Sequence, residues 1–441
     1  MKTKFIRSTM ILLIGGAITK ILGMIIKIVM TRNIGSTGMG IYMLLSPTFM
    51  LLISLAQLGL PIAISTLIAK EENKAKEIIL SCIPIVFIIN IILMCFLIVS
   101  AKFLAYSLVH EPRCYYAFLM IGFVLPFISV SSILRGYFFG TEKMFPHVFS
   151  CVVEDIVWLF TLAFGIPYFI VYGIEYAVAF IVLSNIVSEM TSIIILFCFL
   201  PKKIKITKFD FIPKWSVIKK ILNISLPATG SRFIGSIGYF LEPIIMTHVL
   251  LSVGYSNQFI VNEYGILNGY VLPMLTMPSF FTMAISQALV PVISKSYSQK
   301  KYKATKKRLK MALFVSFSIG LPITLLFVLY PTLPLQIIYQ TKEGVPYLRV
   351  LAPIFLLHYI QAPLTASLQA MEQAKTAMKG TLLGMIFRTI LLFICCYLKI
   401  GLWALVIALS FNIIFVTIHQ ARHVFCLLNK KTTQHEMHPL E

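Results

Sequence analysis

The sequence predicts an all-α polytopic membrane protein whose twelve transmembrane helices form two parallel six-helix lobes around a central cavity. Three observations predict this class: an apolar composition, twelve apolar segments of bilayer length, and a correspondence between the two halves of the chain. Of 441 residues, 59% are hydrophobic and 12% are charged, and the mean hydropathy is +0.90. Soluble proteins average about 25% charged residues, so the composition excludes that class.

Each apolar segment is long enough to cross a bilayer, which takes about 20 residues of helix. The segments are 8–30, 41–69, 78–100, 115–138, 148–171, 176–200, 217–249, 263–291, 309–331, 346–370, 378–398 and 402–428. The longest polar connection separates the first six from the last six. We therefore expect an N-terminal lobe at 1–200, a basic cytoplasmic linker at 201–220, a C-terminal lobe at 221–428 and a polar cytoplasmic tail at 429–441.

The two halves correspond at a spacing of 230 residues. The matching pairs are Gln57 and Gln287, Pro61 and Pro291, and Glu142 and Glu372. Six spans return the chain to the side on which it began, so the repeats are parallel. Parallel repeats pack about a pseudo-two-fold axis along the membrane normal, with the substrate site between them.

The basic residues predict orientation. The chain has 38 Lys and Arg against 16 Asp and Glu, a formal net charge of +22. With the N-terminus inside, 28 basic residues, Arg135 among them, fall on the cytoplasmic side, six outside and four within spans. This asymmetry is the positive-inside pattern, which predicts cytoplasmic termini and makes binding to nucleic acid an unnecessary explanation.

Motifs for catalysis, disulfides or metals are not found in the sequence. The eight cysteines form no CxxC pair or regular framework, and we find no P-loop, HExxH or aspartate-rich motif. An adjacent acid pair, Glu154 and Asp155, is interpreted as a cap or an interlobe salt bridge. The first apolar run lacks a signal-peptide cleavage site, so we expect it to remain as a span. We expect no enzyme, no metal and no cofactor.

The first span carries Lys20 and Lys27, seven residues apart and hence on one helical face. A charge at the centre of a span costs about 2.5–3.5 kcal/mol on insertion scales. Gly16 and Gly23 share that side and leave room in front of the ammonium groups. This arrangement favours one wall of a water-filled cavity that receives an anion.

The seventh span carries Arg232 among glycines, including Gly230 and Gly235. Tight helix packing would also explain the small residues, but the arginine favours a cavity wall, because its planar fork of donors suits phosphate oxygens. We expect Lys20, Lys27 and Arg232 to surround one interlobe site.

The remaining charged residues of the spans leave alternatives open. Glu242 and Glu189 are interpreted as counter-charges, proton carriers or structural ion-pair partners. Arg388 either joins the site or pairs with an acid on a neighbouring helix. Arg32 precedes a glycine-rich turn at the outer surface, where it anchors the headgroup region or acts as an outer gate.

Three stretches resemble the stage V sporulation protein B family, which belongs to the polysaccharide flippases of the multidrug/oligosaccharidyl-lipid/polysaccharide (MOP) exporter superfamily. They are KILGMIIKIVMTRNIGSTGMGIYMLLSPTFMLLISLAQLGLPIAISTLIAKE, RGYFFGTEKMFPHVFSCVVEDIV and SLPATGSRFIGSIGYFLEP. The resemblance implies a MATE-like fold that alternates between inward-open and outward-open forms. By position it implies a cavity role for Lys20 and Arg232 and an outer-turn role for Arg32, whereas Lys27 rests on the helical-face argument alone.

The implied cargo is an undecaprenyl-pyrophosphate-linked saccharide, such as a lipid II-like peptidoglycan precursor for the spore cortex. Many relatives carry two further C-terminal spans, and the lipid II flippases hold the lipid tail there, so we expect a tail path between the lobes or another lipid-linked cargo. A proton gradient, a sodium gradient or the membrane potential could reset the carrier. We expect a monomer in the bacterial cell membrane, with the developing spore's membranes as an alternative location.

Three other functions compete with the flippase. A cation-coupled multidrug or small-molecule exporter of the same superfamily would be expected to have cavity acids, but the first span has lysines and no acid. A membrane enzyme acting on polyprenyl-linked sugars would need an acid cluster or metal motif. A non-transporting scaffold would be unaffected by the loss of Lys20, Lys27 or Arg232.

Overall fold

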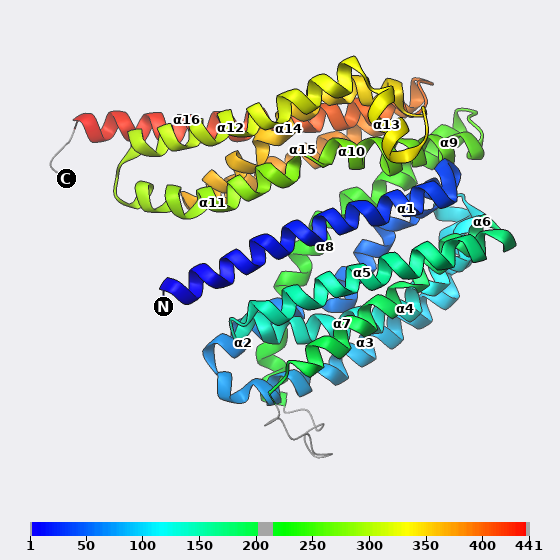
Figure 1. Ribbon diagram of the computed structural model, residues 1–441, viewed down its shortest axis with the longest axis horizontal. Helices are drawn as coiled ribbons and strands as arrows, with labels where there is room; N and C mark the ends of the chain where they lie inside the picture. Colours follow the sequence, from blue (N-terminus) through cyan, green and yellow to red (C-terminus); the bar gives the residue numbers. More distant parts are fainter. Residues whose placement is uncertain (1, 202–214, 438–441) are drawn as a thin grey trace. The chain divides into compact units, whose positions relative to one another are not determined.

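The computed structural model describes residues 2–201 and 215–437, and every regular element in that part is a helix (Figure 1). Among the described residues, nine helices are long and apolar enough to cross a membrane, or up to eleven if each of two bent pairs is one span. The all-α membrane fold is therefore confirmed. The count of twelve stays a prediction.

The first helix, α1 (Lys2–Gln57), covers more than one predicted span. Gly35 interrupts it with φ 63° and ψ −171°, and Figure 1 shows the chain turning back there. Positive φ is a conformation that glycine adopts without steric cost. The predicted turn after Arg32 is thus a break at Gly35. A second break, at Gly59 with φ 58°, precedes α2 (Leu60–Lys70).

Residues Met1–His248 and Asn257–Gly265 form one compact unit, hereafter unit 1. Its further helices are α3 (Ala75–Phe103), α4 (Tyr115–Gly140), α5 (Met144–Phe169), α6 (Ile174–Leu183), α7 (Asn185–Cys198), most of α8 (Trp215–Ser252) and α9 (Asn257–Gly265). Buried apolar residues of α2, α3, α4 and α7 form a core that Ile221 of α8 joins. Burial of such side chains stabilises the unit by roughly 1.5–3 kcal/mol each.

Most of α8 belongs to unit 1, whereas we expected it in the second lobe. Residues 221–248 were assigned to the second lobe, but by their contacts they belong to unit 1. Gly59 makes this packing possible, because a Cβ at that position would come within 2.8 Å of the Ser225 backbone oxygen in α8. The sequence repeat itself stays a prediction, and most of the linker lies outside the described residues, at 202–214.

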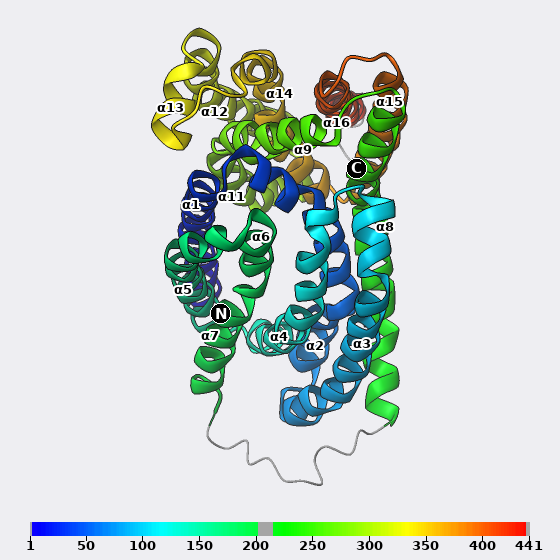
Figure 2. The same ribbon diagram turned by 90° about the vertical axis from the view of Figure 1, so that its right-hand side faces the viewer.

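Unit 2 comprises Val249–Ser256 and Ile266–Glu441. Its helices are α10 (Leu272–Thr276), α11 (Ser279–Ser298), α12 (Tyr302–Leu329), α13 (Thr332–Tyr339), α14 (Val345–Ala370), α15 (Ala374–Tyr397) and α16 (Trp403–Met437). Within it, α15 lies beside α16 and α12 beside α14 (Figure 2). The helix α16 continues to Met437, so much of the predicted tail at 429–441 is helical, and residues 438–441 lie outside the described part.

Two corresponding turns have the same backbone form. Glu142 and Glu372, paired at the spacing of 230, both have positive φ, at 56° and 62°. The following residue in each turn, Lys143 or Gln373, donates its N–H to the carbonyl five residues earlier, at 3.0 and 2.8 Å. This agreement supports the predicted repeat at these turns.

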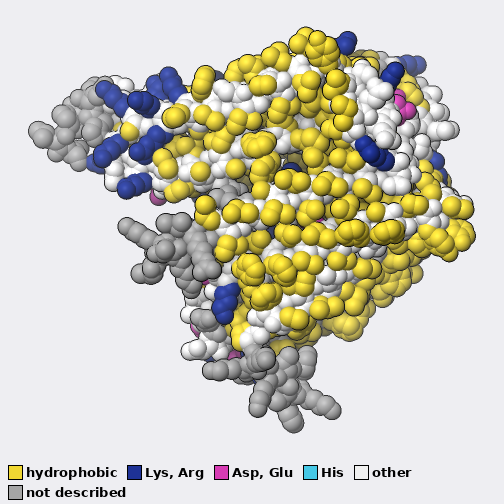
Figure 3. Space-filling view, viewed as in Figure 1, with side chains coloured by type: hydrophobic (Ala, Val, Ile, Leu, Met, Phe, Trp, Pro, Cys, Tyr) yellow, Lys and Arg dark blue, Asp and Glu magenta, His cyan; other side chains and the backbone are white. Residues whose placement is uncertain are grey.

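Charge and hydrophobicity are segregated on the surface of unit 2. Figure 3 shows hydrophobic side chains over most of the visible face, with the largest group of Lys and Arg at one end, near the start of α12. The loop and first turns there contain Lys300, Lys301, Lys303, Lys306 and Lys307. Such a basic end is what the positive-inside rule expects of a cytoplasmic face.

Candidate functional site

The two lysines of α1 lie beside open space. Lys20 is exposed and Lys27 is half-buried. A Cβ built on Gly16 or Gly23 would meet no atom within 4 Å, so these glycines do not serve close helix packing. No ion pair with an acid is found for either lysine in the described part of the chain. Open space therefore lies beside these two glycines, and the room expected in front of the ammonium groups stays a prediction.

Arg232 lies in a bend of α8. The segments Trp215–Gly230 and Gly235–Ser252 meet at 42°, and Arg232 is in the short stretch between them. Its side chain is exposed, and Gly230 and Gly235 have no atom within 4 Å of a built Cβ. These two glycines therefore do not mediate tight packing, which was the alternative explanation. Interrupted membrane helices commonly line substrate sites in transporters.

The three predicted cavity cations are not brought into mutual contact. The first half of α1 and helix α8 lie on different sides of unit 1, as the view in Figure 2 shows. Neither lysine forms a described contact with Arg232. A single site formed by Lys20, Lys27 and Arg232 therefore stays a prediction.

Both predicted glutamates are buried in unit 1. Glu242 of α8 accepts a hydrogen bond from the Tyr264 hydroxyl of α9, at 3.3 Å. Glu189 of α7 lies 3.4 Å from the Arg135 guanidinium of α4. Glu189 thus has the structural ion-pair partner that was one of its alternatives, and its role as a proton carrier stays a prediction.

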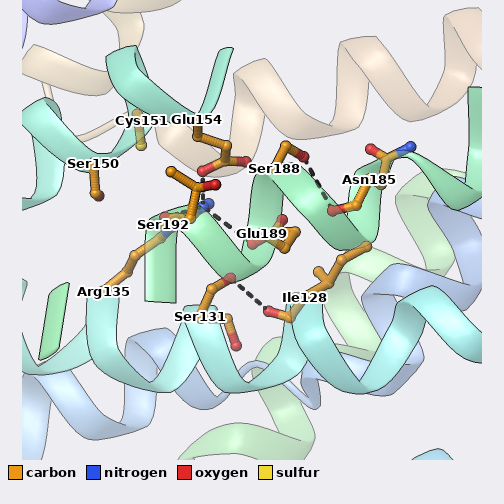
Figure 4. A network of polar contacts seen from close by, with 12 residues as sticks. Ile128, Ser131, Arg135, Ser150, Cys151, Glu154, Asn185, Ser188, Glu189 and Ser192 are labelled. Carbon is orange, nitrogen blue, oxygen red and sulfur yellow. Dashed lines mark hydrogen bonds and ion pairs between the residues drawn. The ribbon is translucent and has the colours of Figure 1, made fainter. Parts of the chain in front are cut away.

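A partly buried polar network surrounds Arg135 (Figure 4). Its Nη2 donates to Glu154 Oε2 of α5 at 2.5 Å and to Ser192 Oγ of α7 at 3.2 Å, besides the contact with Glu189. Charge-assisted hydrogen bonds of this kind are about twice as strong as neutral ones. The network therefore connects three membrane helices of unit 1.

This network corrects one sequence interpretation and adds to another. Arg135, counted among the cytoplasmic residues, is an ion-pair partner inside unit 1 within the candidate span Pro112–Gly140, and the side of the membrane on which it lies stays a prediction. Glu154 was interpreted as a cap or an interlobe bridge, but its partner belongs to the same unit. The physical reason is mutual neutralisation, because a guanidinium among carboxylates avoids most of the cost of an isolated charge in the membrane.

Another polar cluster joins the loop after α3 to α8 and α9. Glu111 is buried, accepts from Arg113 Nε at 2.7 Å and from Asn257 Nδ2 at 2.9 Å. His110 and His248 approach to 3.0 Å between ring nitrogens. Burial lowers the pKa of His110 below its usual value, and the neighbouring His248 adds to the effect. Sequence reasoning missed this cluster, whose members come from three separate segments.

Two predicted site residues remain, and they belong to different units. Arg32 is exposed near the Gly35 break of unit 1, and Arg388 is half-buried in α15 of unit 2. Their roles as outer gate and cavity residue stay predictions. No group of three His, Cys, Asp or Glu able to hold a metal occurs among the described residues.

Apolar membrane-crossing helices, glycine breaks and cations beside open space define a multi-pass membrane protein of the transporter class. The chain belongs to the polysaccharide biosynthesis protein family, whose sequence profile matches residues 5–297. The profile of a second family, MatE, matches residues 237–394.

Curated relatives and solved structures agree with this assignment. The stage V sporulation protein B of Bacillus subtilis (strain 168) is 36% identical, covering 96% of this chain and 84% of that protein. The lipid II flippase MurJ of the same organism is 21% identical over 89% of this chain and 77% of that protein. The inward-facing structure of a multidrug resistance MATE family transporter of the MOP superfamily has 16% identity and a TM-score of 0.74, covering 94% and 96% of the two chains.

These likenesses confirm three expectations. The chain has the MOP-like fold, it belongs to the family that its motifs resembled, and it is a membrane transporter or flippase rather than an enzyme.

Proposed function

We propose that the chain is a flippase that moves an undecaprenyl-pyrophosphate-linked saccharide, a lipid II-like peptidoglycan precursor for the spore cortex, across the cytoplasmic membrane by alternating access. The observation that carries this proposal is the exposed Lys20 and half-buried Lys27 on one face of a membrane helix, beside glycines that front open space. A pyrophosphate is the matching ligand, because two ammonium groups in a low-dielectric setting attract a multiply charged anion strongly.

Arg232 is the third proposed contact of this headgroup. Its place in the bend of α8 supports the proposal, since a change of the bend would move the guanidinium toward or away from the cavity. The lipid tail would stay in the bilayer while the headgroup crosses. Arg32 would act at the outer gate, and Arg388 and Glu242 would be further cavity residues.

The proposal includes coupling to a proton gradient, a sodium gradient or the membrane potential. One charge crossing 100 mV is worth about 2.3 kcal/mol, enough to reset a carrier. Glu189 supports the proton alternative, because it is buried in a network in which two glutamates share one guanidinium. A pH gradient imposed across proteoliposomes, compared with a potassium diffusion potential, separates these alternatives.

We further propose that the protein works as a monomer with both termini in the cytoplasm, in the cell membrane or in the membranes of the developing spore. The charge asymmetry of the loops supports the orientation. Cysteine labelling at either terminus with a membrane-impermeant reagent tests it.

Native mass spectrometry of the purified protein tests the cargo. We expect retention of a lipid II-like lipid and of undecaprenyl pyrophosphate, and weaker retention of a neutral polyprenol. Equal retention of all three lipids would contradict an anion-binding cavity, and selective retention of another lipid-linked polysaccharide would change the cargo.

A cation-coupled multidrug exporter is the second candidate, favoured by the MATE-like fold, by the partly buried Glu154 and by the buried Glu189. It predicts flux of a cationic dye that depends on these glutamates and not on Lys20. Dye flux of this kind, together with no retention of lipid pyrophosphates, would replace the flippase proposal.

A further inference from the structure

A groove runs along one side of α16 in unit 2. Its volume is about 490 Å³, within the range of about 300–1,000 Å³ usual for small-ligand sites. All seven of its lining residues belong to α16 and lie between Phe411 and His423. This part of the helix is inside the candidate membrane span Trp403–Thr433. The groove is therefore complete within unit 2.

The lining changes from apolar to basic along the helix axis. Positions 411 to 418 contribute only phenylalanine and isoleucine side chains. Positions 419 to 423 contribute two imidazoles and the guanidinium of Arg422. At 1.5 Å of rise per residue, the groove extends over roughly 18 Å. An apolar surface that ends in positive charge is the complement of an amphiphile with an anionic headgroup.

The apolar end has the properties of a surface that acyl chains cover. Phe411 and Ile414 are exposed, and Ile418 is 60% exposed. Phe387 of α15 packs edge to face against Phe411 and Phe415, with ring centroids 6.3 and 5.3 Å apart, and so supports this wall from behind. Water would oppose the exposure of such side chains on a membrane helix, whereas hydrocarbon accommodates them. An acyl chain is therefore the matching occupant of this end.

The basic end carries a cation without a partner. Arg422 is exposed and forms no ion pair or hydrogen bond with another described residue. It also lies inside the apolar segment 402–428, where an isolated charge is costly. An anion from outside the chain would neutralise it, and the planar fork of a guanidinium suits the oxygens of a phosphate.

Two histidines add hydrogen-bonding groups beside this guanidinium. His419 lies against α15, because a Cβ built on Gly380 would come within 2.4 Å of its Nδ1. That nitrogen is buried and has no partner among the described residues, so Nε2 is the atom of this ring left for a ligand. His423 is exposed, and its ring centroid lies 4.4 Å from that of His419. A neutral imidazole has one N–H donor, so His423 and Arg422 can donate to the oxygens of one phosphate.

The basic end of the groove points toward the basic end of unit 2. Lys306 of α12 donates to Asn429 Oδ1 of α16 at 2.7 Å, which joins the last turns of α16 to the lysine-rich start of α12. Arg422 precedes Asn429 by seven residues, roughly 10 Å of helix. A cation between an apolar surface and a basic membrane boundary is at the depth where lipid phosphates lie.

We propose that this groove of α16 binds one anionic phospholipid, phosphatidylglycerol, with an acyl chain along Phe411–Ile418 and the phosphate on Arg422 and His423. The inference goes beyond the proposed flippase function and does not rest on it, because the ligand is a lipid of the surrounding bilayer and not the cargo. The bound lipid stabilises the folded chain by mass action, since only the folded helix presents the groove.

Native mass spectrometry of the full chain, stripped of bulk lipid, tests the preference for the headgroup. The probes are phosphatidylglycerol and phosphatidylcholine with identical acyl chains. The variants are Arg422→Gln and Arg422→Lys, with Lys310→Gln as the matched control, an exposed cation of α12 outside the groove. We expect the wild type to prefer phosphatidylglycerol. Arg422→Gln should weaken binding of that lipid by about fivefold without affecting phosphatidylcholine, whereas Arg422→Lys and Lys310→Gln should keep the preference.

A phosphatidylglycerol with a photoreactive acyl chain locates the site on the same protein. We expect crosslinks in the peptide that contains Phe411–Ile418, and fewer of them in Arg422→Gln at an unchanged melting temperature without added lipid. Added phosphatidylglycerol should raise the melting temperature of the wild type more than that of Arg422→Gln.

Four results would overturn the inference and leave the flippase proposal intact. Equal affinity of the wild type for the two phospholipids, or an equal loss in Arg422→Gln and Lys310→Gln, would show only a diffuse attraction to the basic end. Crosslinks confined to other helices would place the lipid elsewhere. Dimers in the spectra in place of bound lipid would assign this face to a second copy of the chain. Tighter binding of undecaprenyl pyrophosphate than of phosphatidylglycerol through Arg422 would assign it to the cargo.

Discussion

The partly buried Arg135 network gives a quantitative test of the structure of unit 1. The Arg135–Glu154 pair has an N···O distance of 2.5 Å, with side chains that are 22% and 16% exposed. The Lys74–Glu71 pair is almost as close, at 2.6 Å, but its side chains are 58% and 41% exposed. The two pairs have nearly equal distances but differ in burial and in the further contacts of Arg135 with Glu189 and Ser192.

Replacing Arg135 with Met should lower the free energy of unfolding by about 3–5 kcal/mol, because Glu154 and Glu189 would be left as buried charges without their partner. Removing the exposed carboxylate by Glu71→Gln should cost far less, because solvent screens its contacts with Lys74 and Lys220. Adding Glu154→Gln and Glu189→Gln to Arg135→Met should recover most of the loss, since the network is then neutral.

Equilibrium unfolding in mixed detergent micelles measures these differences, with Glu71→Gln as the matched control. The reasoning is refuted if Arg135→Met unfolds within about 1 kcal/mol of the wild type. It is equally refuted if the triple variant is less stable than Arg135→Met, because the carboxylates would then not be the source of the instability.

Two further predictions concern stability. Gly40→Ala should destabilise the protein by about 1–3 kcal/mol, because a Cβ there collides with the Val261 backbone oxygen of α9. Gly23→Ala should be neutral or stabilising by up to about 1 kcal/mol, since no atom lies within 4 Å of a Cβ built there. Equal melting temperatures for Gly40→Ala and Gly23→Ala would contradict the packing of α1. The stability contributed by neutral His110 is present above its unfolded pKa of about 6.5 and lost as pH falls through the lower folded value. The melting temperature of the wild type should therefore fall more between pH 7.5 and 5 than that of His110→Asn, which tolerates the φ of 54°. Parallel curves would contradict a lowered pKa of His110.

Much of the fold follows from local properties of the sequence. The length of the apolar runs predicts the spans, and the glycine-rich stretch after Arg32 predicts the break that the structure places at Gly35. The helical spacing puts Lys20, Lys27, Gly16 and Gly23 on one side of the helix. The structure shows open space beside the two glycines of this set.

The Arg135 network was not predictable in the same way. Its acidic partners lie 19 and 54 residues away in the sequence. Arg135 also stands near the end of its span, where a basic residue usually marks the cytoplasmic boundary. Only the packing of α4 against α5 and α7 shows that its charge is neutralised inside unit 1.

The assignment of α8 to unit 1 could not be predicted from the pattern of hydrophobicity either. The repeat at 230 residues describes how the halves correspond, not which unit a helix packs against.

The central claim is that cations of the cavity carry an anionic, lipid-linked headgroup across the membrane. Its most direct test is flux of a lipid-linked saccharide pyrophosphate in proteoliposomes that contain the wild type, Lys20→Ala or Arg232→Ala. Flux by the wild type and its loss in both variants, at unchanged insertion and melting temperature, is the predicted result. Flux at the wild-type rate in both variants would contradict the anionic-headgroup mechanism.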